Sequence, residues 1–142
     1  MKKIFTISVM TGMIFIFAGG CIKEGVGVNE NYWFSKEKGE VVFTDTYCSY
    51  YVVETNYGYT VIRSSGNYHP PYEGSIIYGD FGRNGTREFY NRSSDIIISG
   101  TVVDYDLSYT DAQYAVAYYC PYAKGGNIKK SSLDSLKASR VK

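Results

Sequence analysis

Apolar and aromatic residues fall into short runs separated by glycine, proline and asparagine, a pattern that predicts a β domain. Asn84-Gly85, between two such runs, predicts a tight hairpin, because both central residues of a type I′ turn need a positive φ. Gly100 inside the last run indicates a bulge or sharp bend. Five strands are predicted, at 40–55, 59–63, 75–81, 86–90 and 95–105.

The pattern changes after the last of these runs. Thr110, followed three residues later by Gln113, fits a capping box at the start of a helix. Pro121 ends the segment, so a helix is predicted at 111–120. A strand through 114–120 is the alternative, since a short apolar run fits both periods. The residues at helical spacing are Ala112, Ala115, Val116 and Tyr119.

The expected fold is mainly β: a small five-stranded antiparallel barrel, OB-like, with one C-terminal helix. Closure is favoured because an open sheet would expose two unpaired edges. The barrel domain is placed at 32–123, with Trp33 and Phe34 as its first packed residues. Residues 21–31 lack periodicity and predict a tether. The basic tail at 124–142 is rich in lysine, serine and glycine, and is predicted to be disordered and to add little buried area.

The first 20 residues have the parts of a secretory signal. Lys2 and Lys3 precede a 14-residue apolar run at 4–17, and small residues follow at 18–20. A helix that crosses a membrane needs about 20 mostly apolar residues. The short run therefore favours a cleaved signal peptide at 1–20 over an uncleaved membrane helix.

Ala18-Gly19-Gly20-Cys21 resembles the lipobox of bacterial lipoproteins. Gly19, Gly20 and Cys21 match that motif, whereas Ala18 stands where leucine is commonest. The resemblance implies that Cys21 carries a diacylglyceryl group, that the signal is removed before it, and that the new amine is acylated, with palmitate as the expected acyl chain. It also implies attachment to the cell envelope, and Ile22, which is not aspartate, favours the outer membrane over the inner. Small residues at 18 and 20 also suit an ordinary signal peptidase, which would release a soluble product.

The three cysteines of the chain are Cys21, Cys48 and Cys120. If Cys21 carries lipid, Cys48 and Cys120 remain as an even pair, and a disulfide between them is expected in an oxidising compartment. Two separate buried thiols are the alternative, because a sequence does not show proximity.

Charge is divided between the body and the tail. Residues 24–123 hold six Lys/Arg against 13 Asp/Glu, a net charge of −7, whereas 124–142 carry a net charge of +5. Nucleic-acid binding depends on neutralising phosphates, so the acidic body argues against a nucleic-acid partner.

The sequence contains few residues in patterns that are typical of an active site. His69 is the only histidine, so the usual zinc ligand set is absent, and no metal or other cofactor is expected. A Ser-His-Asp triad is an alternative, but the sequence has no Gly-x-Ser-x-Gly motif that would position its nucleophile. Asp104 and Asp106 alternate onto one face of a strand and could act as a pair of glycosidase carboxylates. No set of catalytic residues is complete, which favours a protein without enzymatic activity.

Sixteen tyrosines are the one compositional excess. Those in predicted loops, Tyr57, Tyr68 and Tyr72, together with His69, are the candidate ligand contacts, because exposed aromatic loops on a rigid barrel suit recognition. The favoured function is a lipid-anchored envelope module that binds an unknown envelope protein or glycan. The alternatives are a small envelope hydrolase using Asp104, Asp106 or His69, and an envelope-assembly accessory whose basic tail touches anionic lipid or wall polymer.

Overall fold

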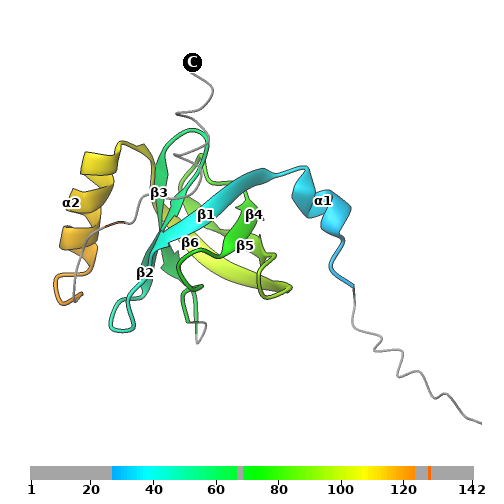
Figure 1. Cartoon of the computed structure of the whole chain (residues 1–142), viewed down its shortest axis with the longest axis horizontal. Coiled ribbons are helices and arrows are strands. Elements are labelled where there is room, and N and C mark those ends of the chain that lie inside the picture. Colours follow the sequence, from blue (N-terminus) through cyan, green and yellow to red (C-terminus); the bar gives the residue numbers. More distant parts are fainter. Residues whose placement is uncertain (1–26, 67–68, 124–127, 129–142) are drawn as a thin grey trace, which may run out of the picture.

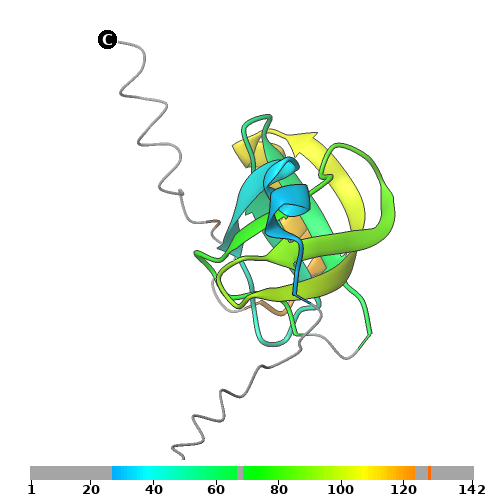
Figure 2. The same ribbon diagram turned by 90° about the vertical axis from the view of Figure 1, so that its right-hand side faces the viewer.

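The computed structural model describes residues 27–66, 69–123 and 128. These residues form a closed barrel of six antiparallel strands, with one helix on each of two opposite sides (Figure 1). Around the barrel the strands follow the order β1-β2-β3-β6-β5-β4, and β4 pairs with β1 to close the ring (Figure 2). The elements are α1 (Glu30–Phe34), β1 (Glu37–Phe43), β2 (Tyr50–Glu54), β3 (Tyr59–Ser64), β4 (Ile76–Gly79), β5 (Gly85–Asn91), β6 (Ile96–Leu107) and α2 (Tyr109–Tyr119).

The mainly β barrel with its C-terminal helix is confirmed, but the prediction of five strands is wrong. The segment predicted as one strand at 40–55 is two antiparallel strands, β1 and β2. Between them the chain reverses at Asp45: its Oδ1 accepts a hydrogen bond from the Tyr47 N–H at 2.8 Å, and its carbonyl accepts one from the Cys48 N–H at 3.2 Å. Residues 44–49 contain no glycine or proline, the strongest turn signals, and the weaker signal of Thr44, Asp45, Thr46 and Ser49 was not recognised.

The hairpin between β4 and β5 is confirmed, but its turn is longer than predicted. Residues 80–84 form the connection, and Gly85 has the expected positive φ of 119°. Among the residues described, only Asp95 and Asp106 have a positive φ without being glycine, so Asn84 does not adopt the type I′ conformation. The longer loop is held by Arg87, whose guanidinium donates a hydrogen bond to the Asn84 carbonyl at 2.7 Å.

Helix α2 confirms the helical alternative for the C-terminal segment, with a different N-cap. Ser108, not Thr110, is the N-cap residue, and its Oγ accepts a hydrogen bond from the Asp111 N–H at 3.2 Å. Ala112 and Val116 are buried, as the helical spacing predicts.

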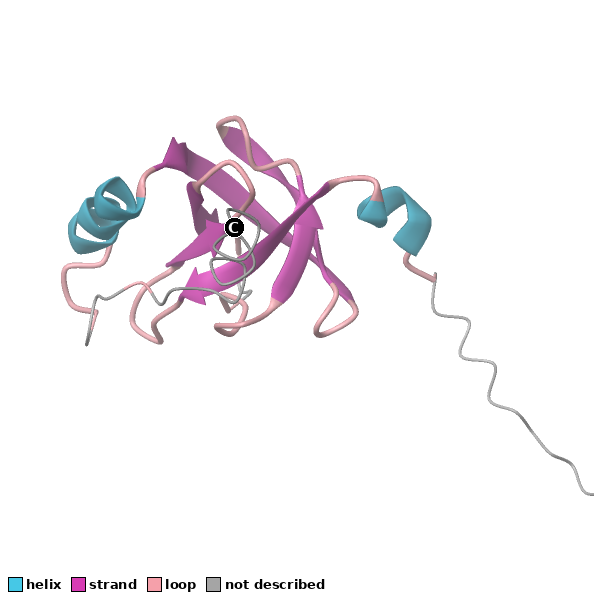
Figure 3. Cartoon of the chain, turned by 45° about the horizontal axis from the view of Figure 1, so that its top comes forward, coloured by secondary structure: helices cyan, strands magenta, loops and turns pink. Residues whose placement is uncertain are grey.

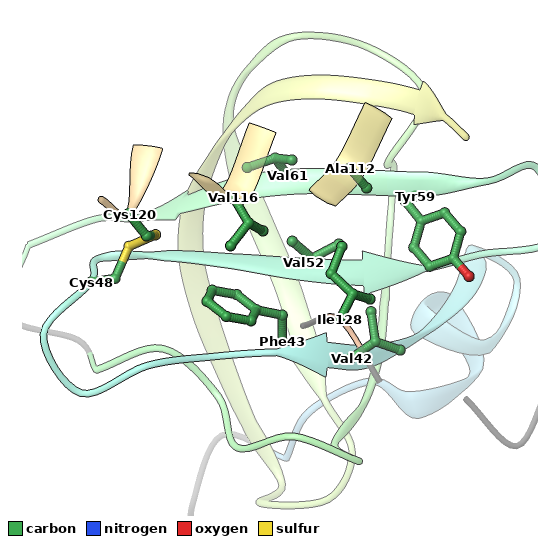
Figure 4. Close-up of a cluster of buried hydrophobic side chains, with 10 residues drawn as sticks. All are labelled: Val42, Phe43, Cys48, Val52, Tyr59, Val61, Ala112, Val116, Cys120 and Ile128. Carbon is green, nitrogen blue, oxygen red and sulfur yellow. A yellow bond between two sulfur atoms is a disulfide. The ribbon is translucent and has the colours of Figure 1, made fainter. Parts of the chain in front are cut away.

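The core has two main layers. One fills the barrel interior with Val41, Tyr51, Val53, Ile62, Ile77, Phe81, Phe89, Ile98 and Val102. The other packs α2 against the outer face of the barrel, with Val42, Phe43, Val52 and Val61 from the strands (Figure 4). Because successive side chains of a strand point to opposite faces, Val41 enters the first layer and Val42 the second.

Gly100 allows close packing in the interior layer of the core. A Cβ at this position would lie 2.7 Å from Ile62 Cγ2, so glycine is needed for a close approach between β6 and β3. The bulge predicted at Gly100 instead lies further along β6: Ile62 pairs with Val102, and its neighbour Val61 pairs with Asp104.

Two segments outside the predicted barrel domain also pack against it. Helix α1 begins within the range predicted as tether, with the Asn29 side chain accepting a hydrogen bond from the Tyr32 N–H. Ile128, within the predicted tail, is 3% exposed and lies in the layer beneath α2. Its carbonyl accepts a hydrogen bond from Tyr109 Oη at 3.1 Å. The expectation that 124–142 adds little buried area is therefore wrong at Ile128, and the rest of that range lies outside the described residues.

Candidate functional site

An open groove of about 410 Å³ lies at one end of the barrel, between the β1–β2 loop and the loop that precedes β4. The two loops meet because the end of the second pairs with β1: the Val41 N–H donates to the Ser75 carbonyl at 2.9 Å, and the Gly74 N–H donates to the Val41 carbonyl at 2.7 Å. The groove walls are Thr44, Asp45, Thr46, His69, Pro70 and Tyr72. Two connections that are distant in sequence therefore form one concave surface.

The groove contains two of the four ligand contacts predicted from the sequence, His69 and Tyr72. Both side chains are exposed, and Tyr72 is 83% accessible to solvent, while Pro71 beside it is buried and holds the loop against the barrel. Tyr57 is also exposed, at 77%, but it lies in the β2–β3 turn, at the opposite end of β2 from the groove loops. Tyr68 lies outside the described residues.

A cluster of exposed tyrosines surrounds the disulfide next to the groove. Cys48 and Cys120 form the predicted disulfide, with their Cα atoms 5.6 Å apart, and so join the β1–β2 loop to the end of α2 (Figure 4). Tyr47 precedes Cys48, and Tyr122 lies two residues after Cys120, so the bond brings the backbone of these two exposed residues close together. With the exposed Tyr118 of α2, they form what we call the tyrosine cluster: Tyr47, Tyr118 and Tyr122.

The tyrosine cluster was not predicted from the sequence. Tyr47 stood in a predicted strand, Tyr118 in the predicted helix, and Tyr122 just after the proline that ends that helix. A signal was present for one member: Tyr118 lies four residues after Tyr114 in the helix, on the face opposite to that on which Ala112 and Val116 are buried. Tyr47 had no such signal, because only the disulfide and the unpredicted turn at Asp45 place it beside α2.

The β1–β2 loop is held on two sides. The disulfide fixes one end of it to α2, and Tyr50, the first residue of β2, stacks on Tyr119 of α2 with ring centroids 4.6 Å apart. Tyr119 Oη in turn donates a hydrogen bond to Asp104 Oδ2 at 3.0 Å. Burial, followed by this bond to a carboxylate, raises the pKa of Tyr119. The loop that forms one wall of the groove is thus attached to α2 at its C-terminal end.

The proposed pair of catalytic carboxylates is not arranged as the alternation predicts. Asp104 pairs with Val61, and its carboxylate accepts a hydrogen bond from Tyr119 of α2. Asp106 lies within a second register shift of β6, between Asp104 and Leu107, and has a positive φ of 54°. This second shift breaks the alternation that would place both side chains on one face.

Glu37 is a further carboxyl group that interacts electrostatically with Asp106. Burial raises the pKa of Glu37 above its ordinary value; a hydrogen bond with Thr55 opposes the rise, and the carboxylates of Asp106 and Asp80 add to it. Glu37 is the first residue of β1, whereas Thr44 of the groove follows the last. At about 3.3 Å per residue, these two positions are roughly 20 Å apart. Asp45 is therefore the one carboxylate among the groove walls.

Within 27–66, 69–123 and 128, no group of three or more histidine, cysteine, aspartate or glutamate side chains is placed to hold a metal ion. In the same part of the chain, no helix has both the length and the apolar character needed to cross a membrane. No protein-family model, curated protein or solved structure matches the chain.

Proposed function

We propose that this protein is an exported binding module of the bacterial cell envelope, anchored in the outer membrane by a lipid on Cys21. The groove between the β1–β2 loop and the loop before β4 is its ligand site. The observation that carries the proposal is the groove, with exposed His69 and Tyr72, beside the tyrosine cluster around the disulfide. The lipid anchor is supported by the lipobox-like residues 18–21 and by the cysteine count, which leaves one cysteine outside the disulfide.

The composition of the groove favours a polar ligand. Two threonine hydroxyls, the Asp45 carboxylate and the His69 imidazole offer hydrogen bonds, while Tyr72 offers a flat ring at the rim. Tyrosine provides contact area at a low cost in side-chain entropy, which is why it is frequent in recognition surfaces. The groove is open, so an extended chain, a wall glycan or a segment of an envelope protein, fits it better than a small apolar molecule.

The arrangement places the proposed ligand site away from the proposed anchor. Helix α1, the first described element, and helix α2 lie on opposite sides of the barrel (Figure 3). The tyrosine cluster lies at the C-terminal end of α2, next to the disulfide that joins α2 to the β1–β2 loop of the groove. An anchored barrel would therefore hold its groove on the side that faces away from the membrane.

Hydrolysis remains the alternative function, and a specific observation favours binding over it. A glycosidase needs two carboxyl groups within about 5 to 9.5 Å across the substrate cleft. Glu37, whose pKa is raised, lies at the far end of β1, and Asp104 is bound to α2. Asp45 would have to act without a second carboxylate in the groove walls.

The lipid anchor is tested by mass spectrometry of the protein isolated from its own cells. The wild-type chain should begin at Cys21 and carry acyl chains, and Cys21→Ser should accumulate as unprocessed precursor. An unmodified mature N-terminus in the wild type would refute the anchor.

Ligand binding is tested by crosslinking in intact cells, followed by recovery of the anchored protein with the wall fraction and its protein partners. Tyr72→Ala should reduce recovery of the ligand about tenfold, which corresponds to the loss of an aromatic contact worth about 1.4 kcal/mol. Tyr57→Ala is the matched control, since Tyr57 is equally exposed on a loop at the other end of β2. Equal effects of the two substitutions, or an effect of Tyr57→Ala alone, would refute the groove as the site.

A further inference from the structure

A second cleft, of about 340 Å³, lies between α1 and the β4–β5 hairpin. Its walls are Tyr32, Trp33, Lys36, Gly79, Asp80, Arg83, Thr86, Arg87 and Glu88. Aromatic residues come from α1 and arginines from the hairpin. The cleft therefore combines flat apolar surface with three cations and two carboxylates, a net charge of +1, a combination that the groove at the other end of the barrel lacks.

Positive charge is concentrated on this side of the molecule. The described residues contain six lysines and arginines, and five of them lie in or next to α1 and the β4–β5 hairpin: Lys36, Lys38, Arg83, Arg87 and Arg92. Five carboxylates of the same region offset them, so this side is neutral: Glu30, Glu37, Asp80, Glu88 and Asp95. The rest of the described chain holds seven carboxylates and Arg63, a net charge of −6. An anionic surface would be repelled by the rest of the barrel and not by the α1 side.

The carboxylates of this side are mostly engaged by neighbouring groups. Asp80 Oδ2 lies 2.7 Å from Arg83 Nη2 and 3.1 Å from Arg87 Nη1. Arg87 directs its remaining donors to backbone carbonyls of the hairpin loop, so its role is to hold that loop. Arg83 and Lys36 are exposed, and they are the cations of the cleft that can meet an outside anion.

Exposed aromatic rings flank the cleft, and cations lie over them. Lys36 Nζ lies 4.8 Å from the centroid of the Tyr32 ring, and Arg92 Cζ lies 5.1 Å from that of Phe34. Both rings are exposed on α1. Aromatic rings accompanied by lysine or arginine are typical of the headgroup level of a bilayer, where the ring enters the interface and the charge stays with the phosphates.

The path of the chain brings this side toward a membrane. Residues 1–26 precede the described structure, which begins immediately before α1 (Figure 1). Eight residues lie between Cys21 and Glu30, and an extended chain covers at most about 3.6 Å for each of the nine steps from one to the other. A lipid on Cys21 would therefore hold α1 within about 30 Å of the bilayer.

We propose that the α1 side of the barrel docks on the anionic phospholipid headgroups of the membrane that holds the N-terminal lipid. Lys36 and Arg83 bind headgroup phosphates at the cleft, and Tyr32 and Phe34 lie at headgroup level. This inference rests on the lipid anchor of the proposed function and is independent of what the groove binds.

Trp33 allows a direct test, because it is the only tryptophan of the chain and lines the cleft. The full-length protein, purified from the membranes of its own cells, is reconstituted into vesicles of phosphatidylcholine that contain brominated lipid, with or without phosphatidylglycerol. Bromine quenches tryptophan fluorescence at short range. Quenching of Trp33 should increase when phosphatidylglycerol is present and should fall again as salt rises.

The variant Lys36→Glu/Arg83→Glu should lose the increase that phosphatidylglycerol causes, since each cation near an anionic surface favours the docked state about fivefold. Arg63→Glu is the control, because Arg63 is exposed on β3, away from α1, and this variant should behave like the wild type. Quenching that is equal in both kinds of vesicle, or that is unchanged in the double variant, would overturn the proposal.

A failure of the anchor is distinguished by flotation with pure phosphatidylcholine vesicles. Wild-type protein that does not float with them has no lipid anchor, and the anchor part of the proposed function fails. The docking surface is then tested by flotation with phosphatidylglycerol vesicles. Binding that requires Lys36 and Arg83 supports the surface, and absence of binding overturns it.

Discussion

Two buried tyrosines should respond in opposite directions to replacement by phenylalanine. Tyr51 and Tyr90 are each 1% exposed. The Tyr51 hydroxyl lies inside the barrel and makes no hydrogen bond with any described residue. The Tyr90 hydroxyl lies 2.9 Å from Asp95 Oδ1 and 3.1 Å from Glu30 Oε1, so its one proton can be donated to either carboxylate. Tyr51→Phe should therefore stabilise the fold, and Tyr90→Phe should destabilise it.

The expected magnitudes follow from these two environments. A buried hydroxyl without a partner costs about 1 to 3 kcal/mol, so Tyr51→Phe, which keeps the ring and its packing, should raise the free energy of unfolding by about 1 kcal/mol. A hydrogen bond to a charged group contributes about 1.5 to 3 kcal/mol, so Tyr90→Phe should lower the free energy of unfolding by about 2 kcal/mol.

The two tyrosines also make stability depend on alkaline pH. Burial raises the pKa of Tyr51 well above its ordinary value of 10.0. Burial, and then the hydrogen bonds to Asp95 and Glu30, raise the pKa of Tyr90 to about 12. Between pH 10 and 12 the unfolded chain loses these protons while the folded chain keeps them. The stability that the two protonated tyrosines contribute is therefore complete below pH 10 and is lost as pH rises above 10, for Tyr51 by up to about 1.4 kcal/mol per pH unit.

Urea unfolding, followed by Trp33 fluorescence and circular dichroism, measures both effects. At pH 7 the order of stability should be Tyr51→Phe, wild type, Tyr90→Phe. Above pH 10 the loss of stability with pH should be less steep in Tyr51→Phe than in the wild type, by about 1.4 kcal/mol per unit. A Tyr51→Phe variant that is less stable at pH 7, or that keeps the wild-type slope, would contradict a buried hydroxyl without a partner.

Three further substitutions address the disulfide, the tail and the barrel interior. Cys48→Ala/Cys120→Ala should lower the free energy of unfolding by about 4 kcal/mol, since the bond joins residues 72 positions apart; a loss below about 1 kcal/mol in urea unfolding would show that the bond constrains the unfolded chain little. Ile128→Ala should lower the free energy of unfolding by about 2 kcal/mol, because its side chain packs beneath α2; unchanged thermal unfolding would show that its burial adds nothing. Gly100→Ala should destabilise by about 1 to 3 kcal/mol, since the new methyl group would meet Ile62; a melting temperature equal to that of the wild type would show that β6 moves aside at no cost.

Several features were determined by local sequence. Strands β3, β5 and β6 and helix α2 lie close to where the apolar runs and the helical spacing predict them. Strand and helix periods involve residues a few positions apart, so the order of side chains along the chain is enough to specify them. The pairing of Cys48 with Cys120 followed from the number of cysteines and the expected oxidising compartment.

Other features arose only when distant segments met. The turn at Asp45 converts one predicted strand into β1 and β2, and closure of β4 onto β1 makes a barrel of six strands. That closure brings the loop containing His69 and Tyr72 against the β1–β2 loop, and the disulfide brings Tyr47 to α2. Tyr57 and Tyr72 looked equivalent in the sequence because exposed loop tyrosines share the same local pattern. The register and closure of the barrel, which depend on pairing between strands far apart in the chain, decided that one lines a groove and the other stands alone at the opposite end.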